Sequence, residues 1–201
     1  MAAIDAQQVK ELREMTGAGM MDCKKALSEP KGNVQEAVDY LRKKGLSAAA
    51  KKAERVTKEG LIGHYVHSNG KIAVLVEVGC ETDFVARTDD FKALVRDLAM
   101  HVAASNPLAV RREEIDPAMV ARERDLMTAQ VAEMGKPAAV IQKIIEGKLE
   151  KWYADNALME QPFVKDPDRK ISDVVSGVIA KLGENIQVRR FVRMALGETQ
   201  S

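Results

Sequence analysis

The sequence has few aromatic residues, few cysteines and no excess charge of either sign. Aromatic residues make up 4% of the 201 positions, whereas hydrophobic residues of all kinds make up 46%. This balance favours helices packed through Ala, Val, Leu, Ile and Met over an aromatic-rich β-sandwich. Lys and Arg total 31 against 30 Asp and Glu, so no net field draws the chain to nucleic acid or a membrane. A binding partner must be recognised by shape and local chemistry.

The two cysteines, Cys23 and Cys80, lie far apart in the sequence. A small secreted scaffold uses more cysteines and a zinc site pairs them at short spacing, so we expect two reduced thiols. The first residues lack a basic segment followed by an apolar stretch, and no window approaches the roughly 18 apolar residues of a membrane span. We therefore expect a soluble, cytoplasmic protein that makes no contact with a membrane.

Hydrophobic periodicity predicts three short helices at the N-terminus. Apolar residues recur at helical spacing over residues 5–28, with a turn at 16–19. Asn33 followed by Glu36 is a capping-box-like start of a third helix, which Gly45 is predicted to end.

The next segment predicts a β-hairpin. The period changes from 3.6 to 2 at Gly60, and the β-rich runs 61–67 and 71–78 are joined by Ser-Asn-Gly at 68–70. Because the second run is apolar at both alternating sets of positions, we expect this strand to be covered on both faces.

Capping residues mark the helices that follow. Thr88 is predicted to cap a helix that ends at Asn106, Asp116 caps the next helix, which should end at Gly135, and Pro137 starts another. The buried stripe of the first of these helices is expected to contain Phe91, Leu94, Val95, Leu98 and Val102.

The end of the chain predicts one more helix and one strand. Residues 165–169 form a predicted loop, and apolar residues from Val174 onward predict a helix that ends at Gly183. Residues 186–196 predict a strand whose apolar side chains share one face, interrupted by Arg190.

These elements predict the fold class α+β. We expect a three-helix domain over residues 1–46, an exposed helical linker over 47–59 and an α+β core over 60–201. In the core, the C-terminal strand should join the hairpin in a small antiparallel sheet, and helices should cover one face of that sheet.

The sequence contains no recognisable catalytic motif. The glycines of residues 17–22 superficially suggest a dinucleotide loop, but they follow a helix, and an aspartate occupies the place of a phosphate. His64 and His67 are three apart on a predicted strand and so point to opposite faces, and His101 has no carboxylate or cysteine at ligand spacing. We therefore expect no enzyme activity, no cofactor and no metal site.

One segment between the hairpin and the next helix carries a family resemblance. From the residues alone, Phe84 could be either a core residue or an exposed one. Thr82-Asp83-Phe84-Val85-Ala86-Arg87 matches the Thr-Asp-Phe-Val-Ala-Lys/Arg signature of elongation factor Ts, and residues 12–27 are similar to that family's other signature. The two matches occur in the right order. The chain thus resembles the short form of elongation factor Ts, without room for a duplicated core or a coiled-coil insertion.

This resemblance implies a function and the residues that perform it. The family promotes guanine-nucleotide exchange on the GTPase elongation factor Tu, and its first domain resembles a ubiquitin-associated three-helix fold. The resemblance implies that Asp83 and Phe84 enter the GTPase beside its Mg²⁺ site, and that Thr82 and Val85 frame the same loop.

A second contact is implied for the N-terminal helices. Arg13, Met20 and Met21 would dock on the nucleotide-binding domain of the GTPase, and flexible methionines suit an adaptable contact. The alternative for Met20 and Met21 is that they belong to the core of the three-helix domain.

A non-covalent homodimer is also predicted, because one face of so small a sheet needs cover. His64, Val66 and alternate residues of 186–196 could pack against a second copy. Two other functions compete with nucleotide exchange. The N-terminal helices could be a general peptide-binding module, or basic residues at 51–55 and 189–190 could bind RNA, although the balanced charge argues against direct nucleic-acid binding.

Overall fold

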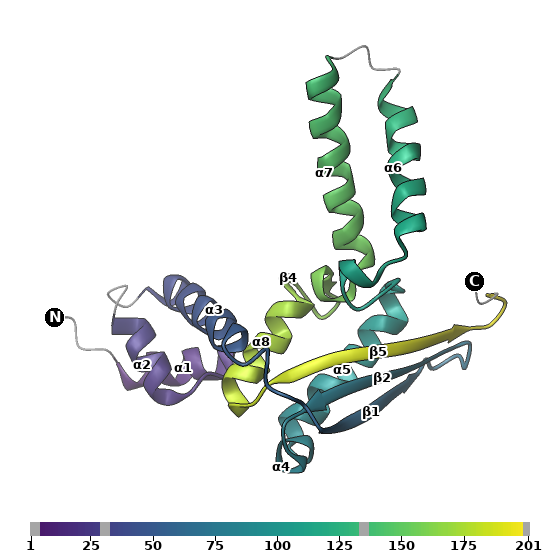
Figure 1. Cartoon of the computed structure of the whole chain (residues 1–201). Helices are drawn as coiled ribbons and strands as arrows, with labels where there is room; N and C mark the ends of the chain where they lie inside the picture. The colour runs from purple at the N-terminus through teal and green to yellow at the C-terminus, as the bar shows by residue number, and fades with distance from the viewer. Residues whose placement is uncertain (1–4, 29–32, 133–136, 199–201) are drawn as a thin grey trace.

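The computed structural model describes residues 5–28, 33–132 and 137–198. Three helices lie at one end, a three-stranded sheet with helices on one face forms the centre, and a pair of long helices projects from this core (Figure 1). The arrangement confirms the predicted α+β class with a helical N-terminal part. The predicted end of a helix at Gly135 falls outside the described residues.

The N-terminal helices are α1 (Ala6–Thr16), α2 (Met20–Ser28) and α3 (Val34–Ala50). The Asn33 side chain accepts hydrogen bonds from the backbone N–H groups of Gln35 and Glu36, which confirms the predicted cap. The three helices share a small core of their own, made of Leu12, Cys23, Ala26, Leu27, Ala37 and Leu41.

Gly45 does not end α3, contrary to the prediction. The helix continues through Gly45 to Ala50, and turns follow it instead of the expected helical linker. A Cβ on Gly45 would lie 3.7 Å from the backbone oxygen of Ser176 and 3.9 Å from the Cβ of Ala180. Close packing of α3 on another helix therefore offsets the roughly 1 kcal/mol by which glycine disfavours a helix interior. The division of the chain into domains at residues 46 and 59 stays a prediction.

The central sheet contains β1 (Glu59–Val66), β2 (Ile72–Cys80) and β5 (Ile186–Ala195). Its order is β1-β2-β5 and both pairs are antiparallel, which confirms the hairpin and the return of the C-terminal strand. Helices α5 (Asp89–Ser105) and α8 (Ile171–Leu182) pack into the same core as the sheet. Thr88 caps α5 by accepting from the Phe91 N–H, and the predicted stripe of α5 is buried.

The other face of the sheet is open, so the prediction that β2 is covered on both sides is wrong. Val74, Val76 and Val78 are buried against the helices, whereas Leu75 points the other way and is 52% exposed. An antiparallel sheet needs only one covered face. The exposed apolar residues of this outer face are Ile62, Val66, Leu75, Val192 and Met194.

A β-bulge explains the irregular pattern of β5. Val188 lies opposite Val78, but Arg190 lies opposite Glu77, so Arg189 is an extra residue. The bulge exchanges the two faces of the strand, and the prediction of one apolar face along its length is wrong. The apolar residues are buried before the bulge (Ile186, Val188) and exposed after it (Val192, Met194).

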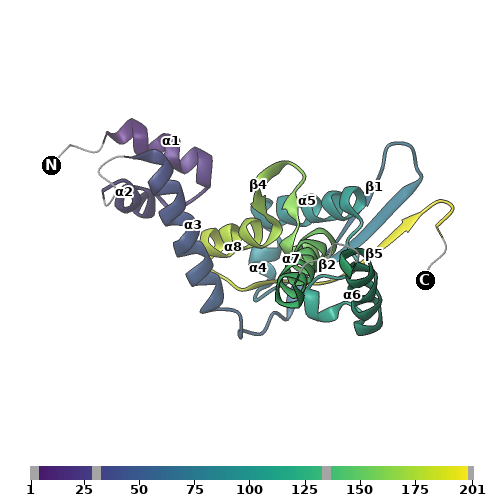
Figure 2. The same cartoon turned by 90° about the horizontal axis from the view of Figure 1, so that it is seen from above.

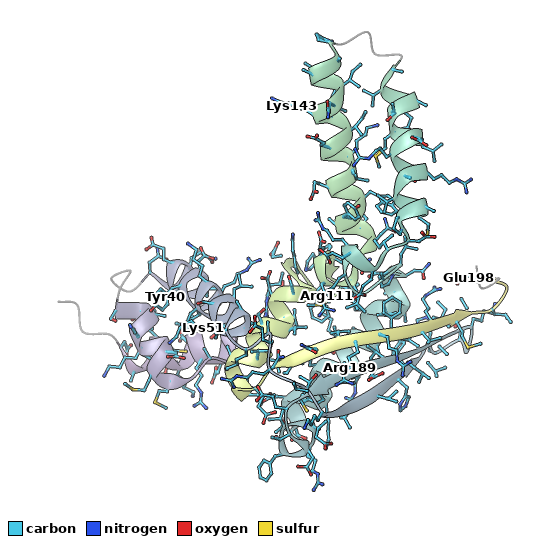
Figure 3. All side chains as sticks on the ribbon, viewed as in Figure 1. Tyr40, Lys51, Arg111, Lys143, Arg189 and Glu198 are labelled. Atoms are coloured by element: carbon cyan, nitrogen blue, oxygen red, sulfur yellow. The ribbon has the colours of Figure 1, made fainter. Side chains whose placement is uncertain are left out.

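Helices α6 (Pro117–Ala132) and α7 (Ala138–Asn156) form an antiparallel pair. They lie side by side and project from the core (Figures 1 and 2). They have their own apolar seam of Met127, Val131, Ile145 and Leu149. In Figure 3, Lys143 lies on the projecting part of α7, well away from Arg111 near the base. The expectation that the chain lacks room for a coiled-coil insertion is therefore wrong.

The base of this pair is held by Arg112. Its guanidinium donates to both carboxylate oxygens of Glu150 in α7, at 3.0 Å each, and to Glu160 at 2.6 Å. It also lies 4.7 Å from the centre of the Tyr153 ring. These contacts lower the pKa of Glu160 and fix the direction in which the helices leave the core.

The predicted loop at 165–169 is a short strand. β4 (Asp166–Lys170) pairs with β3 (Pro162–Phe163), and the buried Phe163 anchors this small hairpin in the core. Nearby, the fully buried His101 Nε2 lies 2.9 Å from Gln161 Oε1, and its Nδ1 accepts from the Val164 N–H. Long-range packing, which has no local sequence pattern, orders this segment.

Candidate partner-binding site

The segment with the family signature folds as one helical turn, α4 (Asp83–Ala86), immediately after β2. The Thr82 hydroxyl caps the turn and accepts from the Val85 N–H at 3.4 Å. Val85 and Ala86 are buried in the main core. Residues on one side of the turn therefore anchor it, and residues on the other side are presented outward.

Phe84 is 82% exposed, so the alternative that it belongs to the core is wrong. Asp83 beside it is also exposed and accepts from the Arg87 guanidinium at 2.7 Å, one helical turn away. Such an exposed pair contributes little stability. The exposed phenyl ring of Phe84 and the carboxylate of Asp83 are thus neighbours on a turn that the buried Val85 anchors in the core.

The sequence pattern does not indicate Glu184 as part of this site, because it lies 102 residues from Thr82. Its carboxylate accepts from the backbone N–H groups of Glu81 and Thr82 at 3.1 and 3.0 Å. It also accepts from the Thr82 hydroxyl at 2.6 Å. No local pattern indicates such a contact, since it joins the start of α4 to the end of α8.

Both cysteines are free and buried, as expected. Burial raises the pKa of the Cys80 thiol to about 11, and its Sγ donates to the Thr82 carbonyl at 3.1 Å. Burial also raises the pKa of Cys23. Neither group is a thiolate at neutral pH, so neither has the character of a nucleophile.

The predicted docking residues of the N-terminal helices are on the surface. Arg13 is exposed, Met20 is 60% exposed and Met21 is 76% exposed, so the alternative that the methionines form the domain core is wrong. Met15 is exposed to a similar degree, although its helical spacing is that of a core position. The three methionines give this end of the molecule flexible apolar side chains.

The signature residues of α4 and the predicted docking residues of α1 and α2 do not line one common pocket. α4 and the helices α1 and α2 are separate in both views of the molecule (Figures 1 and 2). A cleft of about 460 Å³ lies between α3, α8 and the turn before α2, and Phe84, Met20 and Met21 do not line it. Within the described residues, no group of three His, Cys, Asp or Glu side chains could hold a metal ion.

None of the described helices is long and apolar enough to span a bilayer. Asp83, Phe84, Met20 and Met21 are outward-pointing side chains on anchored elements and do not line a cavity. Such an arrangement is typical of the class of proteins that contact another macromolecule through their surface.

Comparison with known proteins identifies the family. A family described as Elongation factor TS matches residues 2–198. Elongation factor Ts of Fervidobacterium nodosum is 60% identical over 195 residues, covering 97% of this chain and 99% of that protein. Elongation factor Ts of Nitratidesulfovibrio vulgaris is 56% identical over 199 residues, covering 99% and 100%. That of Geotalea uraniireducens is 57% identical over 196 residues, covering 98% and 91%. The chain belongs to the elongation factor Ts family of translation factors.

Proposed function

We propose that the protein is a guanine-nucleotide exchange factor that binds elongation factor Tu carrying GDP and promotes GDP release, so that GTP can bind. Membership of the elongation factor Ts family supports elongation factor Tu as the partner. The single observation that carries the proposal is the 82% exposure of Phe84 on an anchored turn. A large aromatic side chain left in water on a well-packed element is typical of a contact residue.

The proposed mechanism acts on the metal of the partner. A GTPase holds GDP through phosphate contacts and a Mg²⁺ ion, which requires near-ideal octahedral geometry. Phe84 would insert beside that site as an apolar wedge, and Asp83 would supply a carboxylate next to it. The Thr82 cap and the buried Val85 anchor the turn on the core. The insertion therefore displaces groups of the partner rather than the turn itself.

The N-terminal helices would provide a second contact. Arg13, Met20 and Met21 would dock on the nucleotide-binding domain and keep Phe84 in place, and exposed methionines adapt readily to a partner surface. Linkage makes the effect reciprocal, because a factor that lowers nucleotide affinity must bind more weakly when the nucleotide is present.

We also propose a non-covalent homodimer through the outer face of the sheet. The predicted His64 and Val66 lie on this face, whereas Ile186 and Val188 are buried in the core and are not available. Both cysteines are buried, which supports association without a disulfide. The GTPase is the alternative cover for the same face.

The two rival functions gain little support. Arg189 and Arg190, proposed above as basic residues for RNA, both pair with Glu77, at 3.2 and 2.7 Å. A general peptide-binding module accounts for the N-terminal helices but not for the exposed Phe84. We expect the protein to act in the cytoplasm, where translation takes place, and to need no cofactor of its own.

The direct test is release of labelled GDP from elongation factor Tu with and without the protein. We expect substoichiometric amounts to accelerate release, because the factor is regenerated after each exchange. Release at the spontaneous rate would contradict the proposal. A pull-down from bacterial lysate in which a translation GTPase does not predominate would favour the general interaction module.

A further inference from the structure

Two turns that are distant in the sequence exchange hydrogen bonds at the base of α4. Glu184 directly follows Gly183, which ends α8 in the left-handed conformation at φ 79°. Its two carboxylate oxygens accept three hydrogen bonds from Glu81 and Thr82, at 3.1, 3.0 and 2.6 Å. In return, the Glu81 carboxylate accepts from the Asn185 N–H at 2.6 Å. We call these four residues, Glu81, Thr82, Glu184 and Asn185, the clasp.

The clasp also reaches the segment that leads out of the N-terminal helices. The Asn185 side chain is buried, and its Nδ2 donates to the carbonyl of Arg55 at 2.7 Å and to that of Ala53 at 3.3 Å. The Arg55 guanidinium lies 3.4 Å from the Glu81 carboxylate. Three chain segments therefore meet immediately before the exposed Phe84.

A turn as short as α4 cannot hold its own conformation. It has four residues, and a single helical turn fixes many dihedral angles for few hydrogen bonds. Carboxylate acceptors form the stronger, charge-assisted class of hydrogen bond. Glu184 uses such bonds on the two N–H groups that lead into the turn and on the hydroxyl that caps it.

We propose that Glu184 is a positioning residue for nucleotide exchange, which holds the α4 turn so that Phe84 is presented before the partner arrives. This inference rests on the proposed function. Glu184 itself does not enter the partner. Its effect is to remove the ordering of residues 81–84 from the cost of inserting Phe84, the step that displaces GDP, which is the general advantage of preorganisation.

The test compares Glu184→Ala with Glu184→Gln in the GDP-release assay. Glu184→Ala should lower the maximal release rate about tenfold, because three acceptor contacts to the turn are lost together. Glu184→Gln should stay within about twofold of wild type, because its amide oxygen still accepts from backbone N–H groups. The matched control is Asp97→Ala, which removes a carboxylate paired with Lys165 at 2.6 Å on α5. It should not change the rate.

A double variant separates positioning from general stability. In a Phe84→Ala background, Glu184→Ala should cause no further loss of exchange, because Glu184 acts through Phe84. Hydrogen exchange of the Thr82 amide gives an independent readout and should be faster in Glu184→Ala. A folding defect would instead lower the melting temperature, slow exchange in both backgrounds and affect Glu184→Gln as well as Glu184→Ala.

The outcomes distinguish the inference from the proposed function. If Phe84→Ala is impaired but Glu184→Ala exchanges like wild type with a protected Thr82 amide, the positioning role is wrong and the proposed function stands. Additive losses in the double variant also overturn the positioning role. If wild type does not accelerate release, or Phe84→Ala behaves as wild type, both are overturned. Should Glu184→Ala fail to fold, a rate of Glu184→Gln reduced tenfold would overturn the positioning role.

Discussion

Phe84 and Phe91 lie on consecutive helices, yet their surroundings are opposite. Phe84 is 82% exposed on α4, whereas Phe91 is fully buried at the start of α5. The Thr82 and Thr88 hydroxyls cap the two helices in the same way, so local structure does not separate the two rings. The two rings differ in exposure because Phe91 packs in the main core with the sheet, whereas Phe84 lies outside that core. Phe91 therefore stabilises the fold, whereas Phe84 is available for the proposed contact with a partner.

The largest effect is expected at Phe91. Phe91→Ala should lower the free energy of unfolding by about 3–5 kcal/mol, because it leaves a cavity in the main core. Chemical denaturation followed by circular dichroism measures this loss. A loss below about 1 kcal/mol would show that the core collapses around the smaller side chain and would weaken the comparison.

Phe84→Ala should have the opposite profile. We expect the rate of GDP release to fall by an amount equivalent to about 2–4 kcal/mol, the range of an aromatic contact at the centre of an interface. The melting temperature should change little, because the ring is already in water. Asp83→Ala should also slow exchange, to a smaller extent. The GDP-release rate and the melting temperature are to be measured on the same Phe84→Ala preparation. Normal exchange with a lowered melting temperature would show that Phe84 is a packing residue and not a contact residue.

The two faces of the sheet extend the comparison to aliphatic residues. Leu75 is half exposed on the outer face, and its neighbour Val76 is fully buried on the inner one. Leu75→Lys should convert the proposed homodimer to a monomer in light scattering while the monomer stays folded, because a charge there is buried only on association. A wild-type protein that is monomeric at micromolar concentration would contradict the homodimer.

The docking methionines should give a moderate effect. Replacing Met20 and Met21 together by Ala should raise the concentration of factor needed for half-maximal GDP release about tenfold, and should leave the maximal rate near wild type. The reason is that these residues contribute affinity and Phe84 contributes the displacement. The control is Met127→Ala, a buried methionine of the α6–α7 seam, which should lower stability instead.

The smallest effect concerns pH. Burial lowers the pKa of His101, whose ordinary value is about 6.5. The unfolded chain therefore takes up a proton more readily than the native one, so the contribution of His101 is fully present above that value and decreases as pH falls below it. The slope is at most about 1.4 kcal/mol per pH unit. Urea denaturation between pH 7 and 5 measures it, and His101→Gln should flatten the dependence. An unchanged slope would assign the dependence to other groups.

Features that depend on neighbouring residues could be predicted from the amino-acid sequence. Asn33 and Thr88 cap their helices, Asn69-Gly70 joins the hairpin, and Thr82 to Arg87 identifies the family. In each case the hydrogen bonds or the turn conformation involve residues only a few positions apart. Such features are set by local sterics and local acceptors, which a sequence pattern records directly.

Features that depend on distant residues became apparent only in the folded chain. α3 continues through Gly45 because α8 packs against it, and the bulge at Arg189 exchanges the faces of β5 because of its pairing with β2. The exposure of Phe84 follows from the burial of Val85 in the core, and its proposed positioning depends on Glu184, which the chain brings back from far along the sequence. Packing and long-range hydrogen bonds leave no periodic trace in the sequence, because the residues that form them are neighbours only after folding.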